Sequence, residues 1–467
     1  MMLSNGKRML RVGTAVLGVL LGAGAAQGQQ KVLHDPAEPL SGAPKPKILP
    51  RPAGAIPRSA FHEKTMKEII HEQVSCGTRL TLSSWTDPKR GAGCGRDFIV
   101  TRFNEIAKQS GGKLEIIVDK FEMQNERTGN KPVHLENVYG ILRGTDAKLA
   151  NTVFIVDGDF DSRPSDVMDP NADAPGADDD SSGIAVMLES ARLLSKAAAE
   201  GHGGRATIIF AAFSGEEQGL LGSYHLLDWV KEKGYIVGGM MDNDIVGADP
   251  APGGPHRVRV FSGNGEIEDA DSPSRELART IEEIAGRDAI RMIFRIDRYG
   301  RGGDHYVFYK AGLPAVRFTE PLEDYTHQHQ TPRTENGVEY GDFEKYLNFT
   351  FMGNVARDNA EVLRQLALAP APPSDVRLYG AVTPDGKLKW TAEEDSERAG
   401  FEILWRETTE SRWNVYDFVP DPGETVLKGV STDNHFFAVR AVGKNGARSI
   451  ATPSQPEVRR APPIDRK

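Results

Sequence analysis

The stretch from Ala174 to Ser223 constrains the fold more than any other part of the chain. It contains APGADDDSSG at Ala174–Gly183, continues as an apolar run with helical spacing, and ends with IIFAAFSGEEQGLLGS at Ile208–Ser223. An acidic turn flanked by glycine therefore opens a helix, and a buried strand follows and ends on two adjacent glutamates. In an α/β sheet the carboxyl ends of parallel strands border one crevice, where ligands bind. Acids gathered there are costly to hold without a cation, so the stretch predicts a metal site.

The composition is that of a globular protein with a sizeable core. The chain has 467 residues, of which 39% are hydrophobic and 26% are charged, so two or three folded units are expected. The net charge is −9 and no basic run offsets it. We therefore expect no nucleic-acid partner.

The N-terminus has the pattern of an export signal. Three basic residues lie among the first eleven, and an apolar stretch of about 15 residues, Val12–Ala26, follows them. This pattern predicts a signal peptide over residues 1–28, because the apolar stretch is short and glycine-rich for a membrane anchor. We expect an exported protein, periplasmic or secreted, with no membrane contact after cleavage.

Cys76 and Cys94 are the two cysteines of the sequence. In an oxidising compartment two cysteines are expected to pair, and the closed loop would contribute about 3 kcal/mol to stability. A zinc site would need further cysteine or histidine ligands close by. The sequence therefore predicts a structural disulfide.

An α/β pattern extends over residues 59–366, after an arm at 29–58 that is rich in Pro, Ala and Lys and is expected to be poorly ordered. Helical and strand patterns alternate, which predicts a mostly parallel sheet flanked by helices. The expected helices are 63–73, 97–110, 181–199, 219–231, 274–286 and 343–366, and the expected strands lie at 114–118, 138–142, 153–156, 206–213, 235–245 and 313–318.

A different pattern begins after a proline-rich linker at residues 367–373. Short β runs separated by turns continue from 374 to 460, which predicts an all-β sandwich. With Trp390 and the segment FAVRAVGKNG at 437–446, this stretch resembles a fibronectin type III domain, although Phe437 stands where that family usually has tyrosine. A polymer, a cell surface and the α/β part itself are the candidate contacts of this domain, and the sandwich fold alone selects none of them.

Four short motifs occur in order within the α/β part: GADD at 176–179, SGEEQGLLGS at 214–223, NDIVG at 243–247 and HQHQTP at 327–332. With these motifs, residues 138–366 resemble the co-catalytic zinc exopeptidases, the family of bacterial secreted leucyl aminopeptidases and glutamate carboxypeptidases. The resemblance implies two zinc ions per chain, a peptide substrate, and hydrolysis by a metal-bound hydroxide.

The resemblance also implies roles for the acids of these motifs. Glu216 is the expected general base, which takes a proton from the attacking water and passes it to the leaving amine. Asp178 is the expected bridging carboxylate, because its two oxygens can each hold one metal. Glu217 would be a ligand of one metal and Asp244 a ligand of the other.

Two histidines compete for the last ligand position. His329 is favoured because Thr331–Pro332 follows it as in the family, and His327 is the alternative, with the remaining histidine lining the substrate pocket. Asp304 and His305 match an upstream D-H motif of the family. We expect this pair to orient ligands or to face the substrate rather than to bind metal.

The first motif departs from the family. The family pattern GHYDS appears here as GDFDS, so Asp159 replaces a histidine ligand, while Asp161 matches the acid that would orient that histidine. Asp159, Asp178 and Asp244 would form an all-oxygen site. Such a site holds zinc weakly or prefers Mn²⁺, Mg²⁺ or Ca²⁺.

Three functions remain open at this point. Peptide hydrolysis is favoured, since Glu216, Glu217 and the segment Gly219–Ser223 match the peptidases. A single zinc held by Asp178, Glu217 and His329 would instead resemble the glutaminyl cyclases of the same fold. A binding protein that has lost its active site is the third possibility.

Specificity and oligomeric state are not determined by these motifs. Acids just before the histidine pair would hold a free α-amino group and favour an aminopeptidase, whereas arginines nearby would hold a carboxylate. The acids are Glu320, Glu323 and Asp324, and the arginines are Arg298, Arg301 and Arg317.

Overall fold

The computed structural model describes residues 49–263, 271–295, 297, 302–380, 383, 385–420, 423–430 and 432–456. The predicted signal peptide, most of the predicted arm, Arg298 and Arg301 lie outside these residues. Within the described part no helix has the length and apolar character needed to cross a membrane.

An eight-stranded sheet forms the centre of the α/β part, with its strands in the order β1-β2-β4-β3-β5-β8-β6-β7. The central strands β4, β3, β5 and β8 are parallel neighbours, whereas β1, β2 and the β6–β8 pair add antiparallel contacts toward the edges. The expected mostly parallel sheet is therefore present at the centre. The strands are β1 (Leu114–Met123), β2 (Val133–Leu142), β3 (Thr152–Asp159), β4 (Thr207–Phe213), β5 (Ile236–Asn243), β6 (Val258–Phe261), β7 (Ile290–Ile293) and β8 (Ala315–Thr319).

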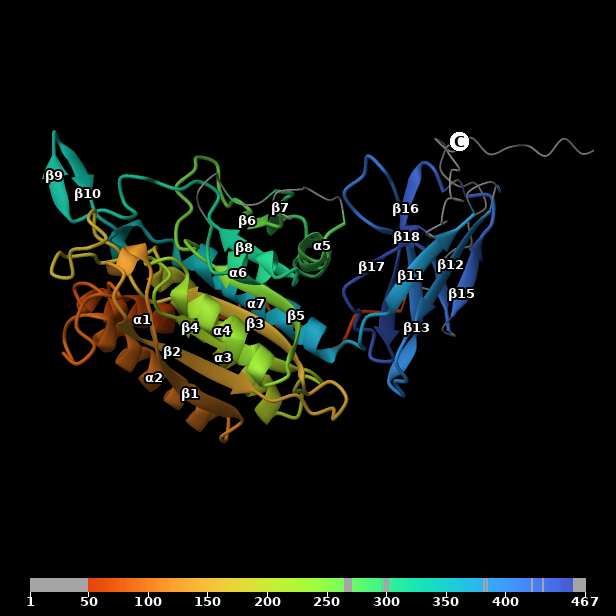
Figure 1. The fold of residues 1–467 in the computed structure, drawn as a ribbon, viewed down its shortest axis with the longest axis horizontal. Helices are drawn as coiled ribbons and strands as arrows, with labels where there is room; N and C mark the ends of the chain where they lie inside the picture. Colours follow the sequence, from red (N-terminus) through yellow and green to blue (C-terminus); the bar gives the residue numbers. More distant parts are fainter. Residues whose placement is uncertain are drawn as a thin grey trace, which may run out of the picture. The chain divides into compact units, whose positions relative to one another are not determined.

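Helices cover both faces of this sheet (Figure 1). One face packs against α1, α2, α3, α5 and α7 in a core that includes Phe103 and Ile184, and the other packs against α4 and α6 through Leu226 and Phe308. Burial on both faces explains why β3 and β4 appear in the sequence as continuous apolar runs. The helices are α1 (Glu63–Ser75), α2 (Ala92–Gln109), α3 (Ser181–Ala199), α4 (Leu221–Glu232), α5 (Pro273–Ala285), α6 (His305–Lys310) and α7 (Phe349–Leu368).

The largest departures from the expected elements lie at helix ends, at short strands, and at β1 and β2, which have 10 residues each although only 114–118 and 138–142 were expected. The closing helix expected from residue 343 begins at Phe349, where the side chain of Asn348 accepts a hydrogen bond from the Phe351 N–H at 3.1 Å. The preceding residues form a short 3-10 helix, Glu344–Tyr346. Strands β6 and β7 and helix α6 were not expected, because each is too short to show a period.

The predicted disulfide is confirmed. Cys76 follows α1 and Cys94 lies in the first turn of α2, and their sulfur atoms are bonded at 2.03 Å. The bond closes a loop with a sequence separation of 18. It therefore ties together the two helices that open the α/β part.

The C-terminal stretch forms two four-stranded sheets, as the all-β pattern predicts. Trp390 is buried and packs edge-on against Phe401 with ring centroids 5.4 Å apart. The strands are β11 (Ser374–Tyr379), β12 (Gly386–Thr391), β13 (Arg398–Glu407), β14 (Asn414–Val419), β15 (Glu424–Leu427), β16 (His435–Gly443), β17 (Thr452–Pro453) and β18 (Gln455–Pro456).

Candidate metal centre

The sheet brings the acidic motifs to one edge. Strand β3 ends at Asp159, β5 ends just before Asp244, and Glu216 and Glu217 follow β4 after two residues. Because β3 is the parallel neighbour of both β4 and β5, the carboxyl ends of the three strands border the same crevice. The convergence expected from the sequence is therefore built by the strand order.

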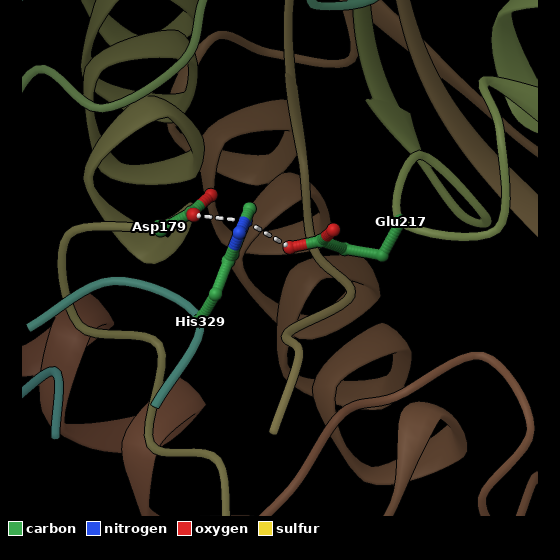
Figure 2. A group of neighbouring side chains, drawn as sticks. All are labelled: Asp179, Glu217 and His329. Carbon is green, nitrogen blue, oxygen red and sulfur yellow. Dashed lines mark ion pairs between the residues drawn. The ribbon is translucent and has the colours of Figure 1, made fainter. Parts of the chain in front are cut away.

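Asp179, Glu217 and His329 form the group that is best placed to hold a metal ion (Figure 2). Each offers one ligand atom, and these atoms lie within 4.8 Å of one another. His329 Nε2 lies between the two carboxylates, 2.9 Å from Asp179 Oδ2 and 2.9 Å from Glu217 Oε1. We call these three residues the metal group.

The metal group fits zinc by the chemistry of its donors. Two carboxylate oxygens and one imidazole nitrogen are ligands that zinc prefers, and three protein ligands leave one position for water or substrate. Burial lowers the pKa of His329, but the charges of Glu217 and Asp179 outweigh it and raise this pKa to about 10. The place between the two carboxylates therefore favours a positive charge.

The expected ligand Asp178 does not lie in the metal group, and its neighbour Asp179 stands there instead. Asp178 Oδ1 accepts a hydrogen bond from the Gly247 N–H at 2.7 Å, and its carboxyl group shares a hydrogen bond with Glu320. Asp342 orients the turn, because its carboxylate accepts the backbone N–H groups of Asp178 and Asp179, each at 2.8 Å. Successive side chains of this turn consequently point to different sides.

The two histidines left open by the sequence have different surroundings. His329 belongs to the metal group, whereas His327 stacks on Tyr346 with ring centroids 3.7 Å apart. His327 Nε2 also lies 3.7 Å from Asp324 Oδ2. The structure thus favours His329 as the ligand and places His327 beside the site.

Asp161 holds the turn that carries both glutamates. Its carboxylate accepts the backbone N–H groups of Glu216 at 3.1 Å and Glu217 at 3.2 Å, and the Thr81 hydroxyl donates to it at 2.9 Å. Burial and the nearby charge of Glu217 raise the pKa of Asp161 to about 7. Asp161 was expected to orient a ligand at position 159, but these contacts make it an anchor for the glutamate turn.

Glu216 precedes Glu217 of the metal group, and the pKa of its carboxyl group is raised. Burial raises its pKa well above the usual value, and the charges of Glu217 and Asp244 raise it further. A general base needs a pKa closer to neutrality than that of a free glutamate. The surroundings of Glu216 shift its pKa in that direction.

Asp159 and Asp244 do not join the metal group within the residues that the structure describes. Asp159 Oδ2 is buried and accepts no hydrogen bond from any described residue. Asp244 Oδ1 lies 3.1 Å from Nη2 of Arg317, whose side chain is 1% exposed and also pairs with Asp297. A buried guanidinium therefore supplies positive charge where the sequence predicts the second metal.

Asp304 and His305 lie behind this edge and not in the metal group. His305 Nδ1 lies 2.8 Å from Asp242 Oδ2, and the His305 N–H donates to the same oxygen at 3.1 Å. A Cβ atom on Gly303 would lie 2.3 Å from that oxygen, which explains why glycine precedes the D-H motif here. His305 thus orients Asp242, whereas the Asp304 backbone carbonyl accepts a hydrogen bond from the Ser223 hydroxyl at 2.7 Å.

Asp180, which the sequence analysis did not single out, joins three elements at the site. Its Oδ1 accepts the N–H groups of Gly183 at 2.9 Å and Ile245 at 3.2 Å, and its Oδ2 accepts the Asp159 N–H at 3.2 Å. It is therefore the N-cap of α3 and a link to the ends of β3 and β5. An aspartate directly before a predicted helix was the signal that would have found it.

Arg79 is the second residue that the sequence analysis missed. Its guanidinium is fully buried and donates to the carbonyls of Phe160 at 2.7 Å, Pro175 at 2.7 Å and Gly176 at 2.8 Å. Burial lowers the pKa of Arg79 to about 10. Arg79 thus ties the segment after β3 to the acidic turn, and no periodic pattern marks such a residue.

An acidic pocket is lined in part by Asp178 and Gln328, the chain neighbours of Asp179 and His329. It is a cavity of about 80 Å³ whose lining includes Asp178, Glu320, Asp324 and Asp342. Burial and the neighbouring Asp178 raise the pKa of Glu320 to about 12, and burial raises that of Asp342 to about 8. Glu323, also expected here, is instead paired at 2.8 Å with an arginine of β6. Crowded carboxyl groups of this kind favour a cationic ligand.

The fold and the metal group together define an α/β protein with a metal-binding edge, and the sequence relatives identify its family. The family model for peptidase family M28 matches residues 137–346. A probable zinc metalloprotease of Pyrenophora tritici-repentis is 37% identical over 431 residues, which cover 86% of this chain and 88% of that protein. A second, from Leptosphaeria maculans, is 38% identical over 83% of this chain and 93% of that protein. The chain belongs to peptidase family M28.

A solved structure shows the same fold. The LapA aminopeptidase of Legionella pneumophila superposes with a TM-score of 0.50 at 19% identity, covering 66% of this chain and 73% of that one. The similarity to LapA supports the α/β architecture.

Proposed function

We propose that the protein is an exported zinc-dependent exopeptidase that removes N-terminal residues from peptides. The observation that carries the aminopeptidase assignment is the acidic pocket, which is lined by the chain neighbours of Asp179 and His329 of the metal group. Its carboxyl groups would bind the free α-ammonium group of a peptide and place the first peptide bond next to Glu216. Internal peptide bonds have no such cation beside them, so hydrolysis would be confined to the chain end.

Glu216 would act as the general base and then as the general acid. Its carboxylate would accept a proton from the attacking water and deliver it to the leaving amine nitrogen. Asp161 would keep the carboxylate in place by holding the N–H groups of Glu216 and Glu217. Zinc bound by Asp179, Glu217 and His329 would supply the Lewis acidity that polarises the carbonyl group and the water.

We propose that the metal group holds zinc tightly and that a second, weaker metal position lies near Asp159 and Asp244. The pairing of Asp244 with Arg317 supports this difference, because the guanidinium already neutralises one of the two carboxylates. An all-oxygen position also suits Mn²⁺, Mg²⁺ or Ca²⁺ better than zinc.

We further propose export by the N-terminal signal and a contact role for the C-terminal sandwich. The signal pattern of residues 1–28 and the Cys76–Cys94 disulfide are both typical of proteins outside the cytosol. The two β-sheets and the buried Trp390 support a sandwich of the fibronectin type III kind, which would bind a polymer or a surface.

The test is hydrolysis of an amino-acid anilide by the mature protein, with metal content measured on the same sample. Zinc-dependent release from the free-amine anilide, and none from its N-acetylated form, is the expected result. Equal hydrolysis of both forms would contradict the aminopeptidase assignment. Absence of turnover by protein with a zinc-loaded metal group would contradict the peptidase function as a whole.

A single-zinc glutaminyl cyclase is the second candidate. The observation in its favour is that the described residues form one metal group of Asp, Glu and His. Cyclisation of an N-terminal glutamine peptide, with no release of amino acids from the anilide, would decide for this alternative.

A further inference from the structure

Arg163 places an accessible guanidinium against the metal group. Its Nη1 lies 3.6 Å from Glu217 Oε2, and its side chain is 26% exposed. A charge-assisted hydrogen bond between an arginine and a carboxylate spans about 2.7–2.9 Å, so this contact is too long to be one. Its buried Nε has no hydrogen-bond partner among the described residues. The guanidinium therefore keeps donors for a further acceptor.

The backbone around Arg163 is locked to the segment that carries His329. The Ser165 N–H donates to Thr331 Oγ1 at 3.2 Å, and the Thr331 N–H donates to Ser165 Oγ at 3.1 Å. These reciprocal bonds join positions two residues beyond Arg163 and two residues beyond His329. The position of Arg163 beside the metal group is consequently built into the fold.

Two arginines near this edge are buried and are not available to a substrate. Arg79 is fully buried among backbone carbonyls, and the side chain of Arg317 is 1% exposed and pairs with Asp297 and Asp244. Arg163 is partly exposed and lies against the carboxylate of Glu217, whereas the exposed Arg127 donates to the Glu217 backbone carbonyl at 3.0 Å.

We propose that Arg163 binds a substrate carboxylate on the leaving-group side of the scissile bond, so that the enzyme prefers dipeptides with a free C-terminus. This proposal rests on the proposed aminopeptidase function and specifies its substrate class. In a dipeptide the α-ammonium and α-carboxylate groups flank one peptide bond, with Cα atoms about 3.8 Å apart. A planar guanidinium matches a carboxylate in two parallel hydrogen bonds, which lysine cannot form.

The placement of opposite charges supports a dipeptide. The acidic pocket includes Asp178, the chain neighbour of Asp179, whereas Arg163 lies against Glu217. His329 lies between Asp179 and Glu217 (Figure 2), so Arg163 and Asp179, the chain neighbour of the pocket residue Asp178, stand at opposite ends of the metal group. An ammonium group at one end and a carboxylate at the other would then hold the peptide bond between them.

The experiment compares leucyl-leucine with leucyl-leucinamide, which differ only in the carboxylate. We expect the wild-type enzyme to have the higher kcat/KM for the acid. Arg163→Met should lower kcat/KM for the acid roughly 10- to 100-fold, mainly through KM, and leave the amide unchanged. Arg163→Lys should keep part of the preference. Arg127→Met is the matched control, because among the described residues Arg127 donates to the backbone carbonyl of Glu217, at 3.0 Å, and its replacement should leave the acid-to-amide ratio unchanged.

Two further measurements separate the possible failures. Zinc content of Arg163→Met must equal that of wild type, since loss of zinc would mean that Arg163 only holds Glu217 and would overturn the proposal. Dissociation constants of both ligands on zinc-loaded Glu216→Gln measure recognition without turnover. If the acid binds more tightly than the amide and Arg163→Met abolishes this difference, the proposed role of Arg163 is supported. If the wild type cleaves neither compound, the proposed aminopeptidase function is refuted, but the role of Arg163 in binding is not. An acid-to-amide ratio of kcat/KM that is the same in Arg163→Met as in the wild type would overturn the proposed role of Arg163.

Discussion

Zinc binding to the metal group is expected to release one proton, because His329 must lose a proton to become a ligand. The carboxylates of Glu217 and Asp179 raise the pKa of His329 to about 10. At pH 8, two units lower, about 99% of this imidazole would be protonated in the metal-free protein. The apparent zinc affinity should therefore rise about tenfold per pH unit from pH 8 to about 9.5 and level off near pH 10.

The pH window lies above the titration of Asp161 but includes that of Asp342, whose pKa burial raises to about 8, so the histidine variants are needed to assign the slope to His329. The pKa of Asp161 is raised to about 7 by burial and by Glu217, so its titration lies below the window. Zinc affinity would be measured by competition with a chelator, and proton release by calorimetry in two buffers of different ionisation enthalpy. His327→Gln should keep the wild-type slope, and His329→Gln should lose most of the affinity together with the slope. A flat wild-type profile, or an equal slope in His329→Gln, would refute the assignment of His329 as the ligand.

Three further predictions concern other residues of the α/β part. Glu216→Gln should lower kcat about 10²- to 10⁴-fold while zinc content stays unchanged, and loss of zinc instead would contradict its role as base. Asp179→Asn should lose zinc through dialysis whereas Asp178→Asn should retain it. The reverse result would show that Asp178 is the ligand, as the motif predicts. Replacing Cys76 and Cys94 together by serine should lower the free energy of unfolding by about 3 kcal/mol in a denaturant titration, and an unchanged midpoint would contradict that estimate.

The central elements could be predicted from the sequence because their patterns are local. Helix α3 has the predicted bounds, Ser181–Ala199, since Asp180 caps its start and apolar residues recur with helical spacing inside it. Residues 153–156 of β3 and most of β4 are continuous apolar runs because both faces of these strands are buried. The order of the motifs along the chain then predicted which strand ends would meet.

The choice between Asp178 and Asp179 could not be made from local pattern. Both belong to the same turn, and neither helical nor strand periodicity assigns a direction to their side chains. Asp342, which lies more than 160 residues later in the chain, decides it by accepting the N–H groups of both residues. The same reason applies to Arg79, whose carbonyl partners come from two segments remote in sequence.

The number of metals per chain depends on whether Asp159 can bind a metal ion in place of the histidine that the family has at this position. Asp244 Oδ1 is already 3.1 Å from the Arg317 guanidinium, so a second cation near it would meet a fixed positive charge in a buried place. We therefore expect one zinc to survive dialysis of the wild type. Asp159→His restores a neutral nitrogen ligand and should increase the retained zinc toward two, whereas Asp159→Asn should not. Two zinc ions retained by the wild type would show that Arg317 orients Asp244 as a ligand and does not compete for it.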